Sequence, residues 1–179
     1  MRDMASVTLI MEDELFRAAV KGDISALSEE NIAKYGEAYY KDRTTPRKNN
    51  IIHIAAEHGR AEFMKKVLAR FPGLGRGKNG NEDTPLHAAA RKGNDEIVRL
   101  LVSLEGSDAI AMQNLQRDTP LHLALSNNKP RVAMDLLQVG PPAVLSLLNN
   151  SQETPLHIFL KYCIGNNVFY PALHLFFLF

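Results

Sequence analysis

Several residue types that would point to a particular chemistry are scarce in this chain of 179 residues. Cys163 is the single cysteine, which excludes an intramolecular disulfide and any zinc site built from several cysteines. A single cysteine also favours a reducing, intracellular compartment. Residues Met1 to Ile10 contain no charged segment followed by a long apolar run, so we expect no secretory signal.

Long apolar runs and an excess of one charge are missing as well. The longest apolar run, Val168 to Phe179, contains Pro171 and His174 and is shorter than the ~18 to 20 residues that cross a bilayer as a helix. The formal net charge is +1, so whole-molecule electrostatics indicates no particular partner. Hydrophobic residues make up 45% of the chain, which is typical of a folded protein rather than a disordered one.

The strongest positive signal is a phrase, Thr-Pro-Leu-His, that recurs at a spacing of 35 residues. A weaker copy, Asn50 to His53, lies 34 residues before the first full one. A fixed period of this length indicates a repeat architecture, in which each unit buries its apolar face against its neighbours. The full copies are Thr84, Pro85, Leu86 and His87; Thr119, Pro120, Leu121 and His122; and Thr154, Pro155, Leu156 and His157.

Each unit is predicted to form two helices joined by a tight turn. Proline at the first helical position and threonine just before it form a helix start, because proline needs no hydrogen-bond partner there and the hydroxyl caps free backbone donors. Gly93 then ends the first helix, since glycine adopts the left-handed conformation easily. Ile97, Val98, Leu100 and Leu101 follow at helical spacing and predict an amphipathic second helix.

The chain resembles the ankyrin-repeat family. The resemblance rests on the Thr-Pro-Leu-His phrases, on the alanine pairs Ala55-Ala56 and Ala89-Ala90, and on Gly93-Asn94 before the second, outer helix of a unit. The resemblance implies an all-α ankyrin-repeat solenoid of about five helix-turn-helix repeats. We expect an N-terminal extension over residues 1–11 and an ankyrin-repeat domain over 12–179. Its repeats would lie near 12–45, 46–79, 80–114, 115–149 and 150–179, the first acting as a cap and the last degenerate.

A finer resemblance is to plant ankyrin proteins of the defence and salt-tolerance group. It is carried by the segments Leu15 to Asp23 and Ile52 to Gly59. Members of that group usually continue into a C-terminal membrane domain called PGG, which this chain does not contain. The apolar run Val168 to Phe179 falls where a fifth outer helix would lie, and as a helix it would expose phenylalanine and leucine side chains to solvent.

The sequence also departs from the family pattern. A glycine commonly lies two residues before the threonine, at the tip of a hairpin-like turn, but Glu82, Arg117 and Gln152 occupy those positions here. Gly80 offers a substitute in the third unit alone, so the pattern predicts hairpin tips less strongly in the fourth and fifth units. Phe159 and Cys163 replace an expected alanine and glycine in the fifth unit.

Three features of the sequence have a possible chemical role as well as a structural one. His53, His87, His122 and His157 invite a metal hypothesis, but repeat spacing places each in a separate unit, whereas ligands must converge on one ion. His53 and Glu57 form a conceivable acid–base pair, with no nucleophile motif to accompany them. The segment Gly73 to Gly80 lacks the Ser or Thr after Gly-Lys that a phosphate loop requires, so we expect a flexible inter-repeat loop.

A basic cluster raises the question of nucleic acid or an anionic membrane surface. Repeat proteins keep their outer faces charged for solubility, and a solvated face is therefore the simpler interpretation. We expect no nucleic-acid partner. The cluster contains Lys41, Arg43, Arg47, Lys48, Lys65, Lys66, Arg70, Arg76 and Lys78.

Together these features predict a protein–protein interaction scaffold without catalytic activity, cofactor or metal, acting in plant stress or defence signalling by resemblance. The alternative is the cytoplasmic ankyrin part of a membrane-anchored signalling protein. We expect a cytoplasmic location, with plasma-membrane association only through the family's membrane domain, and protein partners of unknown identity. By resemblance, the partner would bind the concave surface through Glu57, His58, Asn81, Asp83, Arg91, Lys92, Gln116, Asp118, Ser126 and Asn127.

Overall fold

The computed structural model describes the backbone of residues 14–166 and the side chains of residues 14–161. Within this range every regular element is helical, which confirms the predicted all-α class. The predicted N-terminal extension and the apolar run Val168 to Phe179 lie outside the described residues. Two sets of helices alternate along the chain. The inner helices are α4 (Ile51–Glu57), α6 (Pro85–Lys92), α8 (Pro120–Ser126) and α10 (Pro155–Asn166), and the outer helices are α5 (Ala61–Arg70), α7 (Asp95–Glu105) and α9 (Pro130–Val139).

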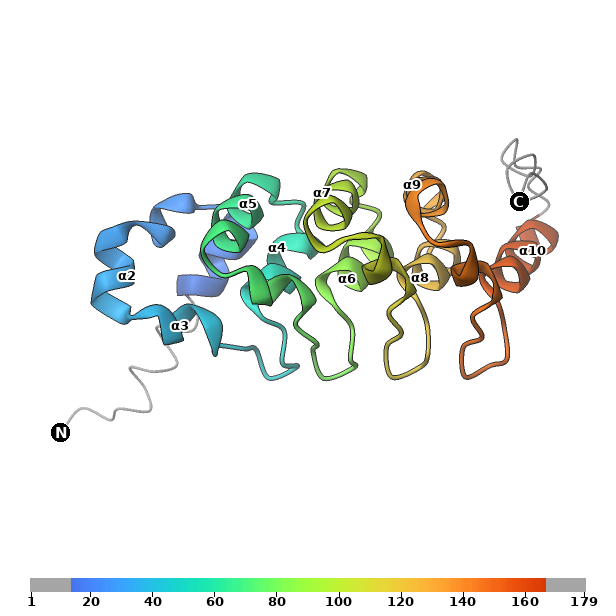
Figure 1. The fold of residues 1–179 in the computed structure, drawn as a ribbon, viewed down its shortest axis with the longest axis horizontal. Helices are drawn as coiled ribbons and strands as arrows, with labels where there is room; N and C mark the ends of the chain where they lie inside the picture. The colour runs from blue at the N-terminus through green and yellow to red at the C-terminus, as the bar shows by residue number, and fades with distance from the viewer. Residues whose placement is uncertain (1–13, 167–179) are drawn as a thin grey trace.

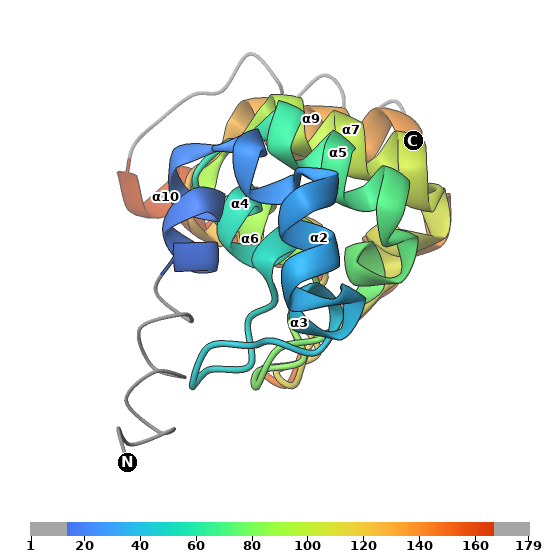
Figure 2. The same ribbon diagram turned by 90° about the vertical axis from the view of Figure 1, so that its left-hand side faces the viewer.

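The helices form two layers that extend in chain order. Figure 1 shows the outer helices in one layer, the inner helices beneath them, and a row of narrow loops projecting from the inner layer. Seen along the row, α5 and α7 overlap in one layer and α4 and α6 in the other (Figure 2). Each unit therefore touches chiefly its neighbours, as the repeat period predicts. A short 3₁₀ helix follows each outer helix, namely η2 (Pro72–Arg76), η3 (Ser107–Ala111) and η4 (Pro142–Ser146).

The first unit is built differently from the others. It contains a helix over residues 14–21, then η1 (Ile24–Leu27), α2 (Glu29–Tyr35) and α3 (Glu37–Lys41). Tyr40 is 1% exposed, stacks on Phe71 at 5.8 Å between ring centroids, and donates its hydroxyl to the Ala26 carbonyl at 2.9 Å. Burial raises the pKa of Tyr40 to about 12. The tyrosine thus fastens this unit to the end of α5.

Small side chains allow the inner helices to lie close together. Ala55, Ala56, Ala89 and Ala90 are fully buried between neighbouring units. Larger apolar residues fill the space between the layers, among them Phe63, Met64, Ile97, Leu101 and Leu136. Close packing of this kind makes the interfaces sensitive to changes of a single methylene group.

The Thr-Pro-Leu-His phrase starts each of the last three inner helices. In α6 the Thr84 N–H donates to His87 Nδ1 at 3.2 Å, and the Thr84 hydroxyl oxygen lies 2.8 Å from the same nitrogen. The reciprocal contacts form a capping box, with Pro85 in the first turn. Asn50 replaces the threonine in α4 and accepts from the backbone N–H groups of Ile52 and His53.

The loops between units, which we call fingers, comprise residues 45–49, 79–83, 114–118 and 149–153. Lys48, Glu82, Arg117 and Gln152 lie at their tips with φ between 57° and 60°. Tips also form in the fourth and fifth units, where the sequence predicted them less strongly for want of glycine. Asn114 explains why: its Oδ1 accepts from the Gln116 and Asp118 N–H groups at 3.0 and 2.9 Å. Such bonds offset the ~1 to 2 kcal/mol that a left-handed residue costs.

One further expectation needs correction. Gly73 to Gly80 is not a featureless flexible loop, because its first part forms η2 and Gly75 is buried where a β-carbon would collide with Glu105. The turn that ends each preceding inner helix uses a left-handed residue, for example Gly93 at φ 86° and Asn128 at φ 55°. Cys163 occupies that position in the fifth unit, and α10 instead continues as helix to Asn166.

Candidate partner-binding surface

The fingers are joined into a continuous row by backbone hydrogen bonds. The Gly80 N–H donates to the Arg47 carbonyl, the Leu115 N–H to the Asn81 carbonyl, and the Asn150 N–H to the Gln116 carbonyl, each at 2.9 Å. The row therefore resists the bending of any single finger. Side chains along it are presented at fixed spacing, which is the main requirement for recognition of an extended partner surface.

Side chains at the bases of the fingers also form hydrogen bonds between neighbouring fingers. Asn114 Nδ2 donates to Asp83 Oδ1 at 2.8 Å, and Asn149 Nδ2 donates to Asp118 Oδ1 at 2.9 Å. In the second and third units, Asn79 Nδ2 donates to Asn49 Oδ1 at 2.7 Å. Each asparagine thus orders its own finger with the oxygen and holds the preceding finger with the nitrogen.

Three of the repeated histidines, His53, His87 and His122, form hydrogen bonds through both ring nitrogens in the same interfaces. The backbone N–H groups of Asn50, Thr84 and Thr119 donate to Nδ1 of His53, His87 and His122 at 3.2 to 3.3 Å. Nε2 lies 2.8 to 3.1 Å from a carbonyl of the next unit, belonging to Asp83, Asp118 and Glu153 respectively. A carbonyl only accepts, so Nε2 carries the proton in all three rings. In His87 and His122 Nδ1 accepts, so these two rings are neutral, whereas Nδ1 of His53 also lies 2.8 Å from Asn50 Oδ1.

Burial makes this neutral form the stable one. Loss of solvation lowers the pKa of His53 and His122 and lowers that of His87 to about 4. Hydrogen bonds from Nε2 to the backbone oppose this effect without cancelling it. In these three rings Nδ1 has no spare lone pair for a metal. Among the described residues, no group of three or more His, Cys, Asp and Glu side chains has the geometry to hold an ion.

Three of the ten predicted contact residues carry internal bonds. Asp83 is completely buried, and its carboxylate accepts from Arg91 Nη2 at 2.6 Å as well as from Asn114. Asp83 is therefore not available to a partner, which corrects that prediction. Arg91 is one-third exposed, so its side chain pairs with Asp83 and also faces the solvent. Asp118 is half-buried and bound to Asn149.

The other predicted residues lie at the surface in two rows. Asn81 and Gln116 are exposed on the fingers. The second row lies at the ends of the inner helices and comprises Glu57, His58, Lys92, Ser126 and Asn127. Ser126 and Asn127 also cap α8 by donating to the Leu123 carbonyl at 3.3 and 2.9 Å.

Sequence reasoning missed several exposed finger residues. Arg47, Lys48, Leu115 and Arg117 all lie on fingers, and Leu115 is 55% exposed. Their position within the 35-residue period is a signal that would have found them, because it matches that of Asn81 and Gln116. Arg47 and Lys48 were not recognised as finger residues because they were assigned to the basic cluster.

Most of that basic cluster is paired with acidic side chains. Arg76 contacts Glu105 and Asp108 of the next unit at 3.1 and 3.0 Å, and Arg70 lies 3.4 Å from Glu37. Lys41, Lys65 and Lys78 pair with Glu37, Glu62 and Glu82. Exposed pairs of this kind contribute little stability. They do lower the positive potential that a nucleic acid would need.

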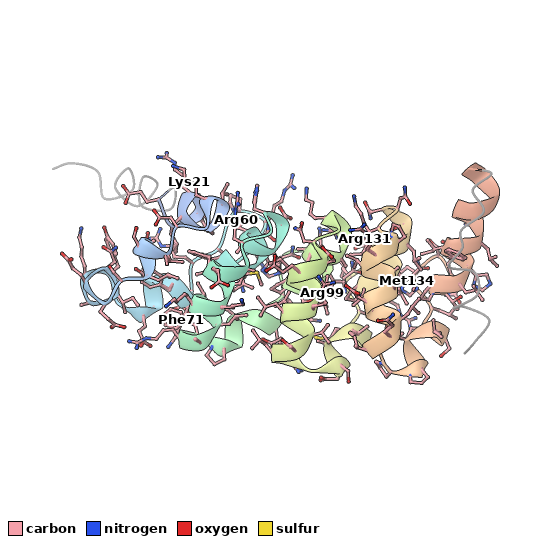
Figure 3. The ribbon with its side chains drawn as sticks, turned by 90° about the horizontal axis from the view of Figure 1, so that it is seen from above. Lys21, Arg60, Phe71, Arg99, Arg131 and Met134 are labelled. Carbon is pink, nitrogen blue, oxygen red and sulfur yellow. The ribbon has the colours of Figure 1, made fainter. Side chains whose placement is uncertain are left out.

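On the side of the protein formed by the outer helices, a shallow groove lies between α7 and α9. It has a volume of about 310 Å³ and is lined by Val98, Val102 and Val139 among others. Arg99 Nη1 crosses it to Asp135 Oδ2 at 2.6 Å. Figure 3 shows Arg99 on α7 and Met134 on α9, viewed from above. Two polar side chains of the groove, Arg99 and Asp135, are therefore already paired with each other.

Comparison with known families agrees with this architecture. A family model described as "Ankyrin repeats (3 copies)" matches residues 15–113, more than half of the chain. The chain belongs to the ankyrin-repeat family. This confirms the resemblance drawn from the Thr-Pro-Leu-His phrases. The repeats indicate a protein-interaction scaffold, since such stacks present an extended binding surface.

One curated relative is Protein ACCELERATED CELL DEATH 6 of Arabidopsis thaliana, which is 36% identical over 55 residues. The alignment covers 31% of this chain and 8% of that protein. The chain thus matches a small part of this relative's length. In the part of the chain that the structure describes, no helix is long and apolar enough to span a membrane.

Proposed function

We propose that this ankyrin protein is a non-catalytic adaptor that binds a protein partner along the fingers and the exposed ends of the inner helices. The observation that carries the proposal is the hydrogen-bonded finger row, which holds exposed side chains at a fixed spacing. Asn81 and Gln116 project from this row, while His58 and Lys92 lie across the inner helices from it. The partner contacts would be mixed in charge.

A non-catalytic role is supported by what the polar groups already do. The three described histidines with a following unit use both ring nitrogens in the repeat interfaces. Asp83 is held by Arg91 and Asn114. General acid–base catalysis needs a group that can reach the substrate and is free to exchange a proton with it. These histidines and Asp83 meet neither condition, because they are held in internal hydrogen bonds.

We further propose that the adaptor acts in plant stress or defence signalling, in the cytoplasm. Support comes from the sequence resemblance to the plant group and from the local similarity to the Arabidopsis protein. The repeat domain would cover residues 12–179 as five units with borders near residues 46, 80, 115 and 150. The second candidate is the cytoplasmic ankyrin part of a membrane-anchored protein, favoured by the same resemblance.

The binding surface is tested by affinity capture with variants that each introduce a glutamate, of which Lys92→Glu and Lys66→Glu are matched charge reversals. His58→Glu and Lys92→Glu change the proposed face, whereas Lys66→Glu makes the same kind of change on the outer helix α5. We expect both proposed-face variants to lose a specific captured protein that the Lys66 variant retains, with unchanged melting temperature for all three. Loss with Lys66→Glu alone would place binding on the outer helices and overturn the assignment.

The membrane-anchored alternative requires a different measurement. Antibody detection of the endogenous protein after membrane fractionation separates the two cases. Recovery in the soluble fraction supports the free adaptor, and recovery in a detergent-dependent membrane fraction at a larger mass supports the anchored form. Neither outcome depends on knowing the partner.

A further inference from the structure

An ion pair joins a finger to the inner helix that follows it in two of the last three units. In the third unit Arg91 of α6 donates to the buried carboxylate of Asp83 at 2.6 Å. In the fifth unit Lys161 of α10 pairs in the same way with Glu153. The two acids hold equivalent positions of the repeat, and so do the two cations. The pair is thus a regular feature of these units.

The fourth unit keeps the acid of this pair but replaces the cation. Asp118 holds the acidic position, and Ser126 of α8 stands where the third and fifth units have an arginine or a lysine. The exposure of the acid changes accordingly, because Asp83 is completely buried whereas Asp118 is half-buried. A carboxylate that solvent can reach therefore lies between two units in which the equivalent charge is neutralised.

The carboxylate of Asp118 is already oriented to receive a cation. Its one side-chain hydrogen bond among the described residues comes from Asn149 Nδ2, which donates to Oδ1 at 2.9 Å. Asn114 Nδ2 holds Asp83 Oδ1 in the same way at 2.8 Å, and there Oδ2 accepts from Arg91. Asp118 Oδ2 is thus fixed in the equivalent direction, beside a much shorter side chain on α8. An acceptor fixed in advance loses less conformational freedom when a ligand binds.

From these relations we infer that Asp118 and Ser126 form a subsite for a lysine or arginine side chain of the protein partner. Figure 1 shows α8, which carries Ser126, between α6 and α10. The partner's cation takes the place against Asp118 Oδ2 that Arg91 takes against Asp83, and its aliphatic stem lies over the serine. The inference rests on the proposed function, because it names the chemistry of a partner that binds this surface.

A basic side chain suits this place better than a free divalent cation. Such an ion prefers six or more oxygen ligands, and no group of three or more His, Cys, Asp and Glu side chains among the described residues could hold one. A long side chain needs a single carboxylate and covers the neighbouring surface with its methylene groups. The cations of the adjacent units, Arg91 and Lys161, are paired with their own carboxylates, which weakens their repulsion of a third cation at Asp118.

The test uses a displayed library of random peptides as the probe and the full chain as the target. Peptides are selected on the unchanged chain in the presence of excess free Ser126→Arg chain, which supplies Asp118 with an internal cation. A parallel selection uses free Ser103→Arg chain, which adds the same side chain at an exposed position of the outer helix α7. We expect peptides rich in Lys or Arg to survive competition by Ser126→Arg and to be lost under competition by Ser103→Arg.

Synthetic forms of a surviving peptide then test the contact itself. Citrulline in place of arginine, or acetyllysine in place of lysine, removes the charge with little change of shape. We expect this replacement, or Asp118→Asn in the chain, to weaken binding about tenfold, since a hydrogen bond between charged groups is lost. Both changes together should weaken binding no more than either alone. Asparagine keeps an oxygen for the Asn149 amide, so the variant should fold, which a circular dichroism melt checks.

The inference is overturned if no peptide survives competition by Ser126→Arg, or if the survivors have no excess of Lys and Arg. Additive losses from Asp118→Asn and the neutral peptide would overturn it as well, because they would show that the two groups do not interact. The proposed function fails in a different way. A captured protein that is lost with Lys92→Glu but retained by Ser126→Arg and Asp118→Asn would leave the surface intact and reject only the subsite, whereas capture retained by every variant would reject the surface.

Discussion

Protonation of the interface histidines should destabilise the protein in mild acid, and His87 should contribute most. Its Nδ1 accepts from the Thr84 N–H at 3.2 Å, and its Nε2 lies 3.0 Å from the Asp118 carbonyl. Adding a proton to Nδ1 would set two donors against each other inside a buried interface. Loss of solvation accordingly lowers the pKa of His87 from 6.5 to about 4 in the folded protein.

The direction and size of the effect follow from that difference. The folded-state pKa is depressed, so the stabilisation is fully present above pH 6.5 and is lost as the pH falls from 6.5 to about 4. One pKa unit corresponds to about 1.4 kcal/mol, which gives roughly 3 kcal/mol for His87. His53 and His122, whose pKa values are also lowered by burial, act in the same direction.

Urea denaturation at pH 7.5, 6.5, 5.5 and 4.5 measures this loss. His87→Gln is the informative variant, because glutamine can still serve in a capping box but does not titrate. It should be less stable at neutral pH yet lose less free energy of unfolding on acidification. His58→Gln, at an exposed position, should follow the unchanged chain. An identical pH slope for His87→Gln, or an NMR titration of His87 near 6.5, would refute the reasoning.

Four other changes test the architecture. Leu86→Ala removes a side chain that is 2% exposed and should cost ~2 to 5 kcal/mol in chemical denaturation, whereas Lys92→Ala should stay within ~0.5 kcal/mol. Ser126→Arg should stabilise by about 0.5 kcal/mol, because it gives Asp118 the cation that Arg91 gives Asp83; no gain in melting temperature would contradict this. Arg117→Gly should raise stability by about 1 kcal/mol by relieving its φ of 59°, and a loss would show that the arginine side chain contributes more than the strain costs. Arg91→Ala leaves the Asp83 carboxylate buried with one amide donor and should cost about 3 kcal/mol, more than the loss from Lys92→Ala on the same helix.

The sequence by itself determined the all-α class, the family and the starts of the inner helices. These features depend on local rules, since proline and a capping threonine fix a helix start wherever they occur. The 35-residue period also indicated stacking between neighbours, because identical faces must bury one another. Stacking of the units could therefore be predicted before any coordinates were known.

Tertiary structure alone decided which polar residues remain free for a partner. Asp83 and Lys92 are both charged residues at repeat positions, yet Asp83 is buried between Arg91 and Asn114 while Lys92 is exposed. The finger tips form without glycine because Asn114 and its equivalents supply bonds within and between units. Each of these outcomes depends on contacts about 30 residues apart in sequence, which local pattern does not specify.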